Sequence, residues 1–190
     1  LHPSLLPQVK ILLREKIFEK VWIQPAAGDA GGALGAALSV WYAHHDNERT
    51  VDSNNDAMNG SYLGPEFSNS EIEMALEECG AKYHKLSEID LVDQVASALS
   101  EEKAVGWMQG RMEFGPRALG GRSIIADPRS PSMQKLLNLK VKYRESFRPF
   151  APSVLREHVH EWFEHDADSP YMLLVGNVKE DRRLTITDEE

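Results

Sequence analysis

A segment rich in arginine, glycine and proline limits the structures that this chain can adopt. It runs from residue 110 to residue 131 and reads GRMEFGPRALGGRSIIADPRSP. Proline fixes its own backbone and glycine reaches conformations closed to other residues, so the segment favours rigid turns over a long helix or strand. An arginine guanidinium is a planar fork of donors that suits phosphate oxygens. The segment therefore predicts an anion site built on turns. It contains four arginines: Arg111, Arg117, Arg122 and Arg129.

Charge is distributed unevenly along the chain. The net charge is −9, yet residues 111–148, here called the basic segment, contain nine Lys and Arg against three acids, a local charge of +6. Such a region in a negative protein indicates a focused anion site, although structural ion pairs are an alternative explanation. The overall charge weighs against a general nucleic-acid binder. In extended geometry, three cations of KVKYRESFRPF would share one face: Lys140, Lys142 and Arg144.

Short apolar runs alternate with helical patterns, which predicts an α/β fold. Strands are expected at 21–23, 83–86, 104–108, 123–126, 150–155 and 171–175, and helices at 5–18, 30–44, 70–78, 88–100, 132–143 and 156–164. Ser70 and Glu73 have the spacing of a capping box.

A turn-rich polar stretch at 47–70 is expected to link two units, 1–46 and 71–190. The apolar runs are far shorter than a membrane span. The single cysteine, Cys79, excludes an internal disulfide and fits the cytoplasm. Because the first residue is not Met, we expect this chain to be part of a longer protein.

Two other features have competing interpretations. The helix at 30–44 is rich in small residues and is predicted to be buried. Asp29 precedes it and could cap the helix or bind a metal; the residues alone favour capping, which stabilises by about 1 kcal/mol. A zinc site at His158, His160 and His165 is disfavoured, since the first two point to different faces of one helix and no cysteine supports them.

Two long motifs resemble a known family. The stretch from residue 106 to residue 155, GWMQGRMEFGPRALGGRSIIADPRSPSMQKLLNLKVKYRESFRPFAPSVL, resembles the C-terminal domain of NodU/CmcH-type O-carbamoyltransferases. WIQPAAGDAGGALGAAL resembles the last segment of their N-terminal domain. The resemblance covers residues 21–175 and implies a YrdC-like twisted α/β sheet preceded by the last strand and helix of an ASKHA-fold domain.

The resemblance implies a reaction as well. ATP and carbamoyl phosphate would form carbamoyl adenylate, and the carbamoyl group would pass to a hydroxyl of a small-molecule acceptor such as a sugar, an antibiotic or a Nod factor. A divalent metal, iron in this family, would be held by the N-terminal domain, where Asp29 matches a metal-binding aspartate, reversing the preference for capping. Glu113 is expected to orient an arginine. The candidate catalytic residues are Arg117, Lys142 and Arg148, and the candidate ligand-binding residues are Arg111, Arg122, Ser123, Lys140, Arg144 and Ser153.

The resemblance leaves gaps. The metal-binding histidines of the family would precede residue 1, and a strand that completes its YrdC-like cavity would follow residue 190. We therefore expect the isolated chain to be inactive and able to self-associate. The alternatives are a tRNA threonylcarbamoyl-type modification enzyme, a noncatalytic module that binds anions or nucleic acid, and an interaction domain whose arginines form structural ion pairs.

Overall fold

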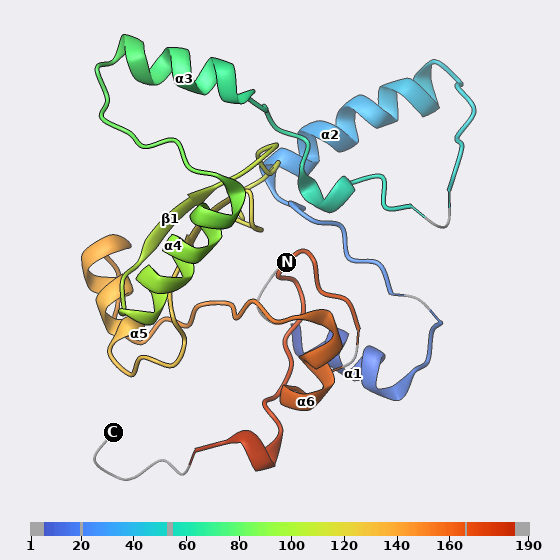
Figure 1. The fold of residues 1–190 in the computed structure, drawn as a ribbon. Coiled ribbons are helices and arrows are strands. Elements are labelled where there is room, and N and C mark those ends of the chain that lie inside the picture. Colours follow the sequence, from blue (N-terminus) through green and yellow to red (C-terminus); the bar gives the residue numbers. More distant parts are fainter. Residues whose placement is uncertain (1–5, 20, 53–54, 166, 185–190) are drawn as a thin grey trace. The chain divides into compact units, whose positions relative to one another are not determined.

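The computed structural model describes residues 6–19, 21–52, 55–165 and 167–184 (Figure 1). Its internal contacts define two compact units. The first combines Leu1–Asn54 with Ser153–Glu190, and the second is Asn55–Pro152. The domain limits expected from sequence, 1–46, 47–70 and 71–190, describe a family organisation and stay a prediction.

The second unit is built on a two-stranded antiparallel sheet. β1 (Val105–Met108) pairs with β2 (Arg122–Ile125), so that Met108 lies opposite Arg122. Helix α4 (Glu88–Ser100) packs against β1 (Figure 1). An apolar cavity of about 250 Å³ lies between α4 and the sheet, lined by Val92, Val95, Ala96, Leu99, Trp107 and Ile125.

Side-chain caps define where two helices of this unit begin. Ser68 caps α3 (Asn69–Glu78) by accepting a hydrogen bond from the Glu71 N–H, and the Glu71 carboxylate accepts one from the Ser68 N–H. The capping box predicted at Ser70 and Glu73 was therefore two residues late. Glu73 instead forms an ion pair with Lys85.

The helix predicted over 132–143 forms as α5 (Met133–Leu136) followed by a π-helical turn, η4 (Leu137–Val141). Lys140 is therefore helical, and the predicted extended face of Lys140, Lys142 and Arg144 was wrong. A short 3₁₀ turn, η3 (Asn59–Ser61), precedes α3.

The first unit contains α1 (Leu6–Glu15), α2 (Asp29–Ser39) and its π-helical continuation η2 (Val40–His44). Its C-terminal part contains η5 (Arg156–His158), α6 (Val159–Trp162) and η6 (Glu180–Arg182). Gly31 is required at the start of α2, because a Cβ there would lie 2.4 Å from the Ala26 carbonyl oxygen. The predicted burial of the 30–44 helix was wrong, since no residue of α2 or η2 is buried.

The structure combines helices with a small antiparallel sheet, which agrees with the α/β prediction at that coarse level. Four predicted strands, at 21–23, 83–86, 150–155 and 171–175, do not form in the described residues. A strand forms only where a second segment pairs with it along its length, and no such strand pairing includes these four runs in the residues that the structure describes. Tyr171 is buried instead, with its ring edge-on to Trp22 at 6.0 Å.

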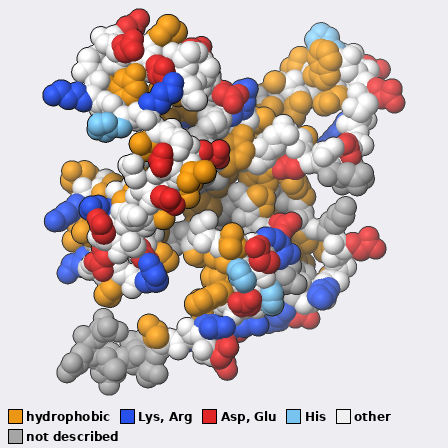
Figure 2. Space-filling view, viewed as in Figure 1, with side chains coloured by type: hydrophobic (Ala, Val, Ile, Leu, Met, Phe, Trp, Pro, Cys, Tyr) orange, Lys and Arg blue, Asp and Glu red, His pale blue; other side chains and the backbone are white. Residues whose placement is uncertain are grey.

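The apolar core is small. The buried hydrophobic side chains among the described residues are those of Met58, Met133, Leu137 and Tyr171. Large apolar side chains remain exposed, as Figure 2 shows, and Ile89 and Phe147 are each 76% exposed. Within the described ranges, no helix has both the length and the apolar character needed to cross a membrane.

Candidate anion-binding site

A buried carboxylate organises the centre of the Gly- and Arg-rich segment. The Glu113 side chain is 0% exposed. Its Oε1 accepts hydrogen bonds from the backbone N–H groups of Leu119 at 2.7 Å, Gly121 at 2.7 Å and Arg122 at 3.2 Å. A single carboxylate oxygen thus gathers the backbone of residues 119–122, here called the 119–122 turn.

The second oxygen of Glu113 fixes an arginine side chain. Arg122 donates from Nε to Glu113 Oε2 at 3.0 Å and from Nη2 to the Glu113 carbonyl oxygen at 3.2 Å. Arg122 is 35% exposed, and its Nη1 makes no hydrogen bond or ion pair with any described residue. The expectation that Glu113 orients an arginine is confirmed, and one guanidinium nitrogen stays available for a ligand.

The Glu113 carboxyl stays ionised across the ordinary pH range. Burial raises its pKa, but the N–H of Leu119 and the guanidinium of Arg122, with further backbone donors, outweigh burial and lower the pKa to about 2. The Glu113–Arg122 pair is therefore net neutral at pH 7.

A tyrosine supports the 119–122 turn from an earlier part of the chain. Tyr62 donates its hydroxyl proton to the Leu119 carbonyl oxygen at 2.8 Å. Gly120 has φ +119° and a Cβ there would lie 3.1 Å from the Tyr62 hydroxyl, so the turn requires glycine at this position. The Ser123 hydroxyl accepts a hydrogen bond from the Gly120 N–H at 3.1 Å. Two sequence-predicted ligand-binding residues, Arg122 and Ser123, thus lie side by side at the start of β2, where the 119–122 turn ends.

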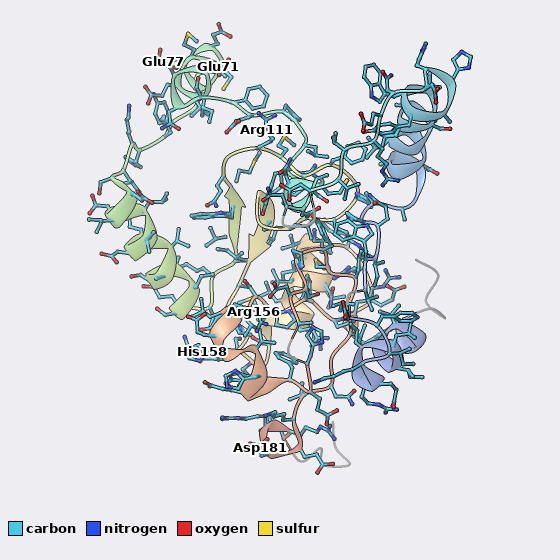
Figure 3. All side chains as sticks on the ribbon, turned by 90° about the vertical axis from the view of Figure 1, so that its right-hand side faces the viewer. Glu71, Glu77, Arg111, Arg156, His158 and Asp181 are labelled. Carbon is cyan, nitrogen blue, oxygen red and sulfur yellow. The ribbon has the colours of Figure 1, made fainter. Side chains whose placement is uncertain are left out.

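Arg111 is occupied by protein contacts. Its side chain, labelled in Figure 3, donates to the Gly64 carbonyl oxygen at 2.8 Å and pairs with Glu66 at 3.0 Å. It is 47% exposed, and such exposed pairs contribute about 0–1 kcal/mol. An anion could therefore displace Glu66 at little cost.

A second cluster forms around a buried amide. Asn138 is 0% exposed and donates from Nδ2 to the carbonyl oxygens of Ser146 at 3.0 Å and Arg148 at 2.8 Å. Its Oδ1 accepts from Arg144 Nε at 2.6 Å, and the Arg144 guanidinium lies 4.7 Å from the centre of the Phe150 ring. Arg148 pairs with Glu145 at 2.8 Å. Asn138 thus holds the loop that carries Arg144 and Arg148.

Three predicted cations are exposed, and none of them is paired with a described residue. Arg117, Lys140 and Lys142 form no side-chain hydrogen bond or ion pair with the part of the chain that the structure describes. Such groups carry their full charge to solvent or to a ligand. These three side chains give the basic segment net positive charge, whereas the paired arginines hold their N–H donors in fixed orientations.

The remaining predicted residues, Ser153 and Asp29, lie in the other unit and both are exposed. Asp29 is the first residue of α2, whose N-cap is Gly28 without a side-chain cap bond, so Asp29 does not cap the helix. Over the described ranges, no three His, Cys, Asp or Glu side chains come together as metal ligands. Asp29 alone does not make a metal site. His158, which Figure 3 labels, pairs with Glu161 on the surface.

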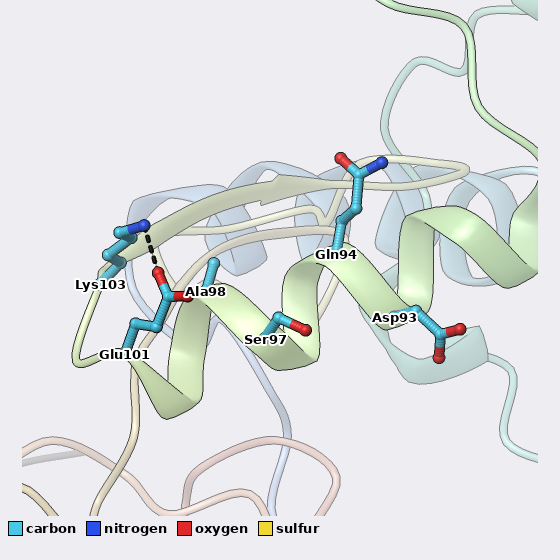
Figure 4. Close-up of a pocket in the computed structure, with 6 residues that line it drawn as sticks. All are labelled: Asp93, Gln94, Ser97, Ala98, Glu101 and Lys103. Carbon is cyan, nitrogen blue, oxygen red and sulfur yellow. Dashed lines mark hydrogen bonds and ion pairs between the residues drawn. The ribbon is translucent and has the colours of Figure 1, made fainter.

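A shallow hollow of about 350 Å³ along α4 is not part of this site. It is lined by Asp93, Gln94, Ser97, Ala98, Glu101 and Lys103, and Lys103 bonds to Glu101 there (Figure 4). None of the candidate arginines lines it. The basic segment, and not this hollow, is the candidate anion site.

Sequence reasoning missed Tyr62 and Asn138. Both donate to backbone carbonyls further along the chain: the partner of Tyr62 follows 57 positions later, and the partners of Asn138 follow 8 and 10 positions later. Tyr62 lies in the 47–70 stretch that was expected to link two units, and that expectation gave no indication of its contact with the 119–122 turn.

Acid should weaken the fold through Glu113. A pKa lowered in the folded state means that the stabilisation is fully present above the unfolded value of 4.5 and is lost as pH falls through about 2. We expect the melting temperature to fall between these pH values, and to fall less steeply in Glu113→Gln. Asp127, whose pKa its hydrogen bonds with Arg129 lower to about 2, contributes the remaining slope. Identical acid profiles for wild type and variant would contradict this assignment.

Removing the Asn138 amide should release the loop at residues 142–150. We expect Asn138→Ala to lower the free energy of unfolding by about 1–3 kcal/mol, since two carbonyls lose a buried donor. Trypsin should then cleave at Lys142, Arg144 and Arg148 faster. Gln134→Ala is the control, because exposed Gln134 donates to the Arg148 carbonyl too, at 3.2 Å. Equal cleavage rates in the two variants would disprove the role of Asn138.

Two models of one protein family match separate parts of this chain. The family model of the carbamoyltransferase C-terminus matches residues 96–188, and that of the carbamoyltransferase N-terminus matches residues 9–38. The uncharacterized protein sll1178 of Synechocystis sp. is 61% identical over 94% of this chain and 29% of its own length. Nodulation protein NolNO of Sinorhizobium fredii is 43% identical over 90% of this chain and 25% of its own length. Nodulation protein NolO of Bradyrhizobium diazoefficiens is 39% identical, over 89% and 31%. The chain spans less than a third of these relatives.

Proposed function

Because the chain belongs to the carbamoyltransferase family, we propose that it is part of an enzyme that activates carbamoyl phosphate with ATP and transfers the carbamoyl group to a hydroxyl of a small molecule. The proposal rests on one observation: the basic segment contains both an arginine held in place, Arg122, and cations that have no partner among the described residues. Two substrates rich in phosphate need both directed donors and net positive charge.

The proposed reaction consumes carbamoyl phosphate, ATP and one water, and it yields carbamoyl adenylate, phosphate and pyrophosphate. Water first cleaves carbamoyl phosphate to carbamate and phosphate. A carbamate oxygen then attacks the α-phosphorus of ATP, and the bond from that phosphorus to pyrophosphate breaks. Negative charge builds on the phosphoryl oxygens and on the leaving pyrophosphate during this attack. Preorganised cations stabilise that charge without reorganising. The hydroxyl of the acceptor then attacks the carbamoyl carbon and releases AMP.

We assign roles from the contacts of each side chain. Arg117 and Lys142 supply unpaired charge, and Arg148 is held by an exposed ion pair that a phosphate can replace. Arg122 and Ser123, the first two residues of β2, present groups whose directions are fixed by hydrogen bonds. Arg111, Lys140 and Arg144 are the supporting ligand-binding residues, and Ser153 is assigned from the family resemblance alone.

The fold assignment and the metal extend the same proposal. The YrdC-like and ASKHA-like folds are proposed for the longer protein, where the exposed apolar faces of this chain would find partners. These faces also favour a homo-oligomer. Asp29 would provide one carboxylate to a divalent metal, but the described residues do not complete a metal site and no step is assigned to it.

The test of transfer uses the full-length protein with ATP, carbamoyl phosphate labelled on its carbon, and a panel of hydroxyl acceptors that includes sugars. The proposal expects ATP-dependent label in a carbamate ester of one acceptor class. Label appearing only on RNA would instead favour a tRNA-modifying enzyme. Label on neither, with hydrolysis as the sole outcome, would count against carbamoyl transfer.

A further inference from the structure

We propose that Glu113 is a positioning residue of the adenylation site, which holds the Arg122 guanidinium in one orientation so that its free Nη1 can bind a substrate oxygen. This inference rests on the proposed function. Glu113 was expected to orient an arginine, but no role in the reaction was predicted for it, and it belongs to none of the predicted sets of catalytic or ligand-binding residues. It is buried and its contacts are all donors from one short turn and one arginine.

The hydrogen bonds of Glu113 require an acceptor at both side-chain positions, which a carboxylate provides and an amide does not. Oε1 faces three backbone N–H groups and Oε2 faces the Arg122 Nε–H. A glutamine has nearly the same size but carries one oxygen and one NH₂ group. Its NH₂ would face either the backbone donors or the arginine donor. Donor would meet donor, and either the turn or the guanidinium would lose its fixed position.

Proton transfer by Glu113 is excluded by the same geometry. Its pKa is lowered to about 2, and four donors already occupy its oxygens. A group that remains ionised and enclosed neither gives nor takes a proton near pH 7. Glu113 therefore acts through Arg122 and the 119–122 turn.

The charge of Glu113 makes its role separable from ordinary stability. Glu113 cancels the charge of Arg122, so net attraction for anions comes from unpaired residues such as Arg117 and Lys142. Neutralising Glu113 adds one positive charge to the local balance. Attraction for ATP and carbamoyl phosphate should then persist or increase, while the directed donor is lost and the rate falls.

The experiment measures kcat and KM for carbamoyl adenylate formation by the full-length protein. In Glu113→Gln we expect kcat to fall about 100-fold while KM for carbamoyl phosphate rises no more than about twofold. Asp127→Asn is the matched control. Asp127 is also a buried carboxylate that accepts from an arginine Nε and a backbone N–H, yet its partner Arg129 lies outside the proposed site. We expect kcat of the control within about threefold of wild type.

Each outcome decides the proposal. Wild-type kcat in Glu113→Gln overturns it, as does an equal loss in Asp127→Asn or a loss confined to KM. If Glu113→Gln does not fold, Arg122→Lys decides, because lysine keeps the charge but cannot reproduce the Nε and Nη2 bonds. It should show the same fall in kcat with KM retained, and a wild-type rate would overturn the proposal. Absence of adenylate from the wild-type protein refutes the proposed function itself, and the role of Glu113 falls with it.

Discussion

Arg117→Ala is expected to lower kcat/KM for carbamoyl adenylate formation by about 100-fold, the typical effect of removing one charge-stabilising donor. Arg117 is exposed and has no partner among the residues that the structure describes. Its charge therefore stabilises no contact among the described residues, and the melting temperature of Arg117→Ala should change little. Kinetics of adenylate formation and thermal melting of the full-length protein measure the two quantities separately.

Lys135→Ala is the matched control for Arg117. Lys135 lies in the same basic segment, is exposed and is likewise unpaired among the described residues. It is not among the residues proposed to contact carbamoyl phosphate or ATP. Its loss should reduce kcat/KM only slightly, through long-range charge that added salt screens. Equal losses in the two variants would mean that the basic segment acts as a diffuse field and that Arg117 makes no specific contact.

Gly121→Ala is expected to disrupt the second unit strongly. Gly121 is buried, and a Cβ there would lie 2.9 Å from the Arg111 carbonyl oxygen and 3.2 Å from the Tyr62 ring. The Glu113 carboxyl carbon would be 3.3 Å away. Overpacking of this kind costs about 1–3 kcal/mol. The melting temperature should fall by several degrees, and adenylate formation should be lost because the 119–122 turn moves.

Gly106→Ala provides the comparison for Gly121. Gly106 lies in β1, and a Cβ there meets nothing within 4 Å. Alanine at this position should leave both stability and activity close to wild type. A Gly121→Ala protein that melts and reacts like Gly106→Ala would show that the turn accommodates a methyl group and is not tightly fixed by Glu113 and Tyr62.

The sequence predicted the helices better than the strands, for a physical reason. Helix α4 formed over residues 88–100 as expected, because its pattern and its cap, Ser87, are local in sequence. The start of α3 was misplaced because SNSEIE contains two overlapping Ser-x-x-Glu pairs, and only Ser68 takes the extended N-cap conformation. The apolar runs at 150–155 and 171–175 did not become strands because pairing depends on distant residues that no local pattern reveals.

The candidate site shows the same division. The composition of GPRALGGRS and the nearby Glu113 were enough to predict an arginine held by a carboxylate. The hydroxyl of Tyr62 and the buried amide of Asn138 escaped notice, because their partners are backbone carbonyls set by tertiary folding. The ligand contacts of Arg117, Lys142 and Arg148 stay predictions, since exposed side chains acquire their geometry from a bound anion.

The most direct test of the proposed adenylation omits any hydroxyl acceptor. The full-length protein is incubated with ATP and carbamoyl phosphate, with and without Arg148→Ala, and carbamoyl adenylate and pyrophosphate are sought by mass spectrometry. We predict that wild type forms both products and that Arg148→Ala loses most of them while remaining folded. If the folded wild-type protein forms neither product, the basic segment is not an adenylation site, and structural ion pairing or nucleic-acid binding becomes the better explanation of its arginines.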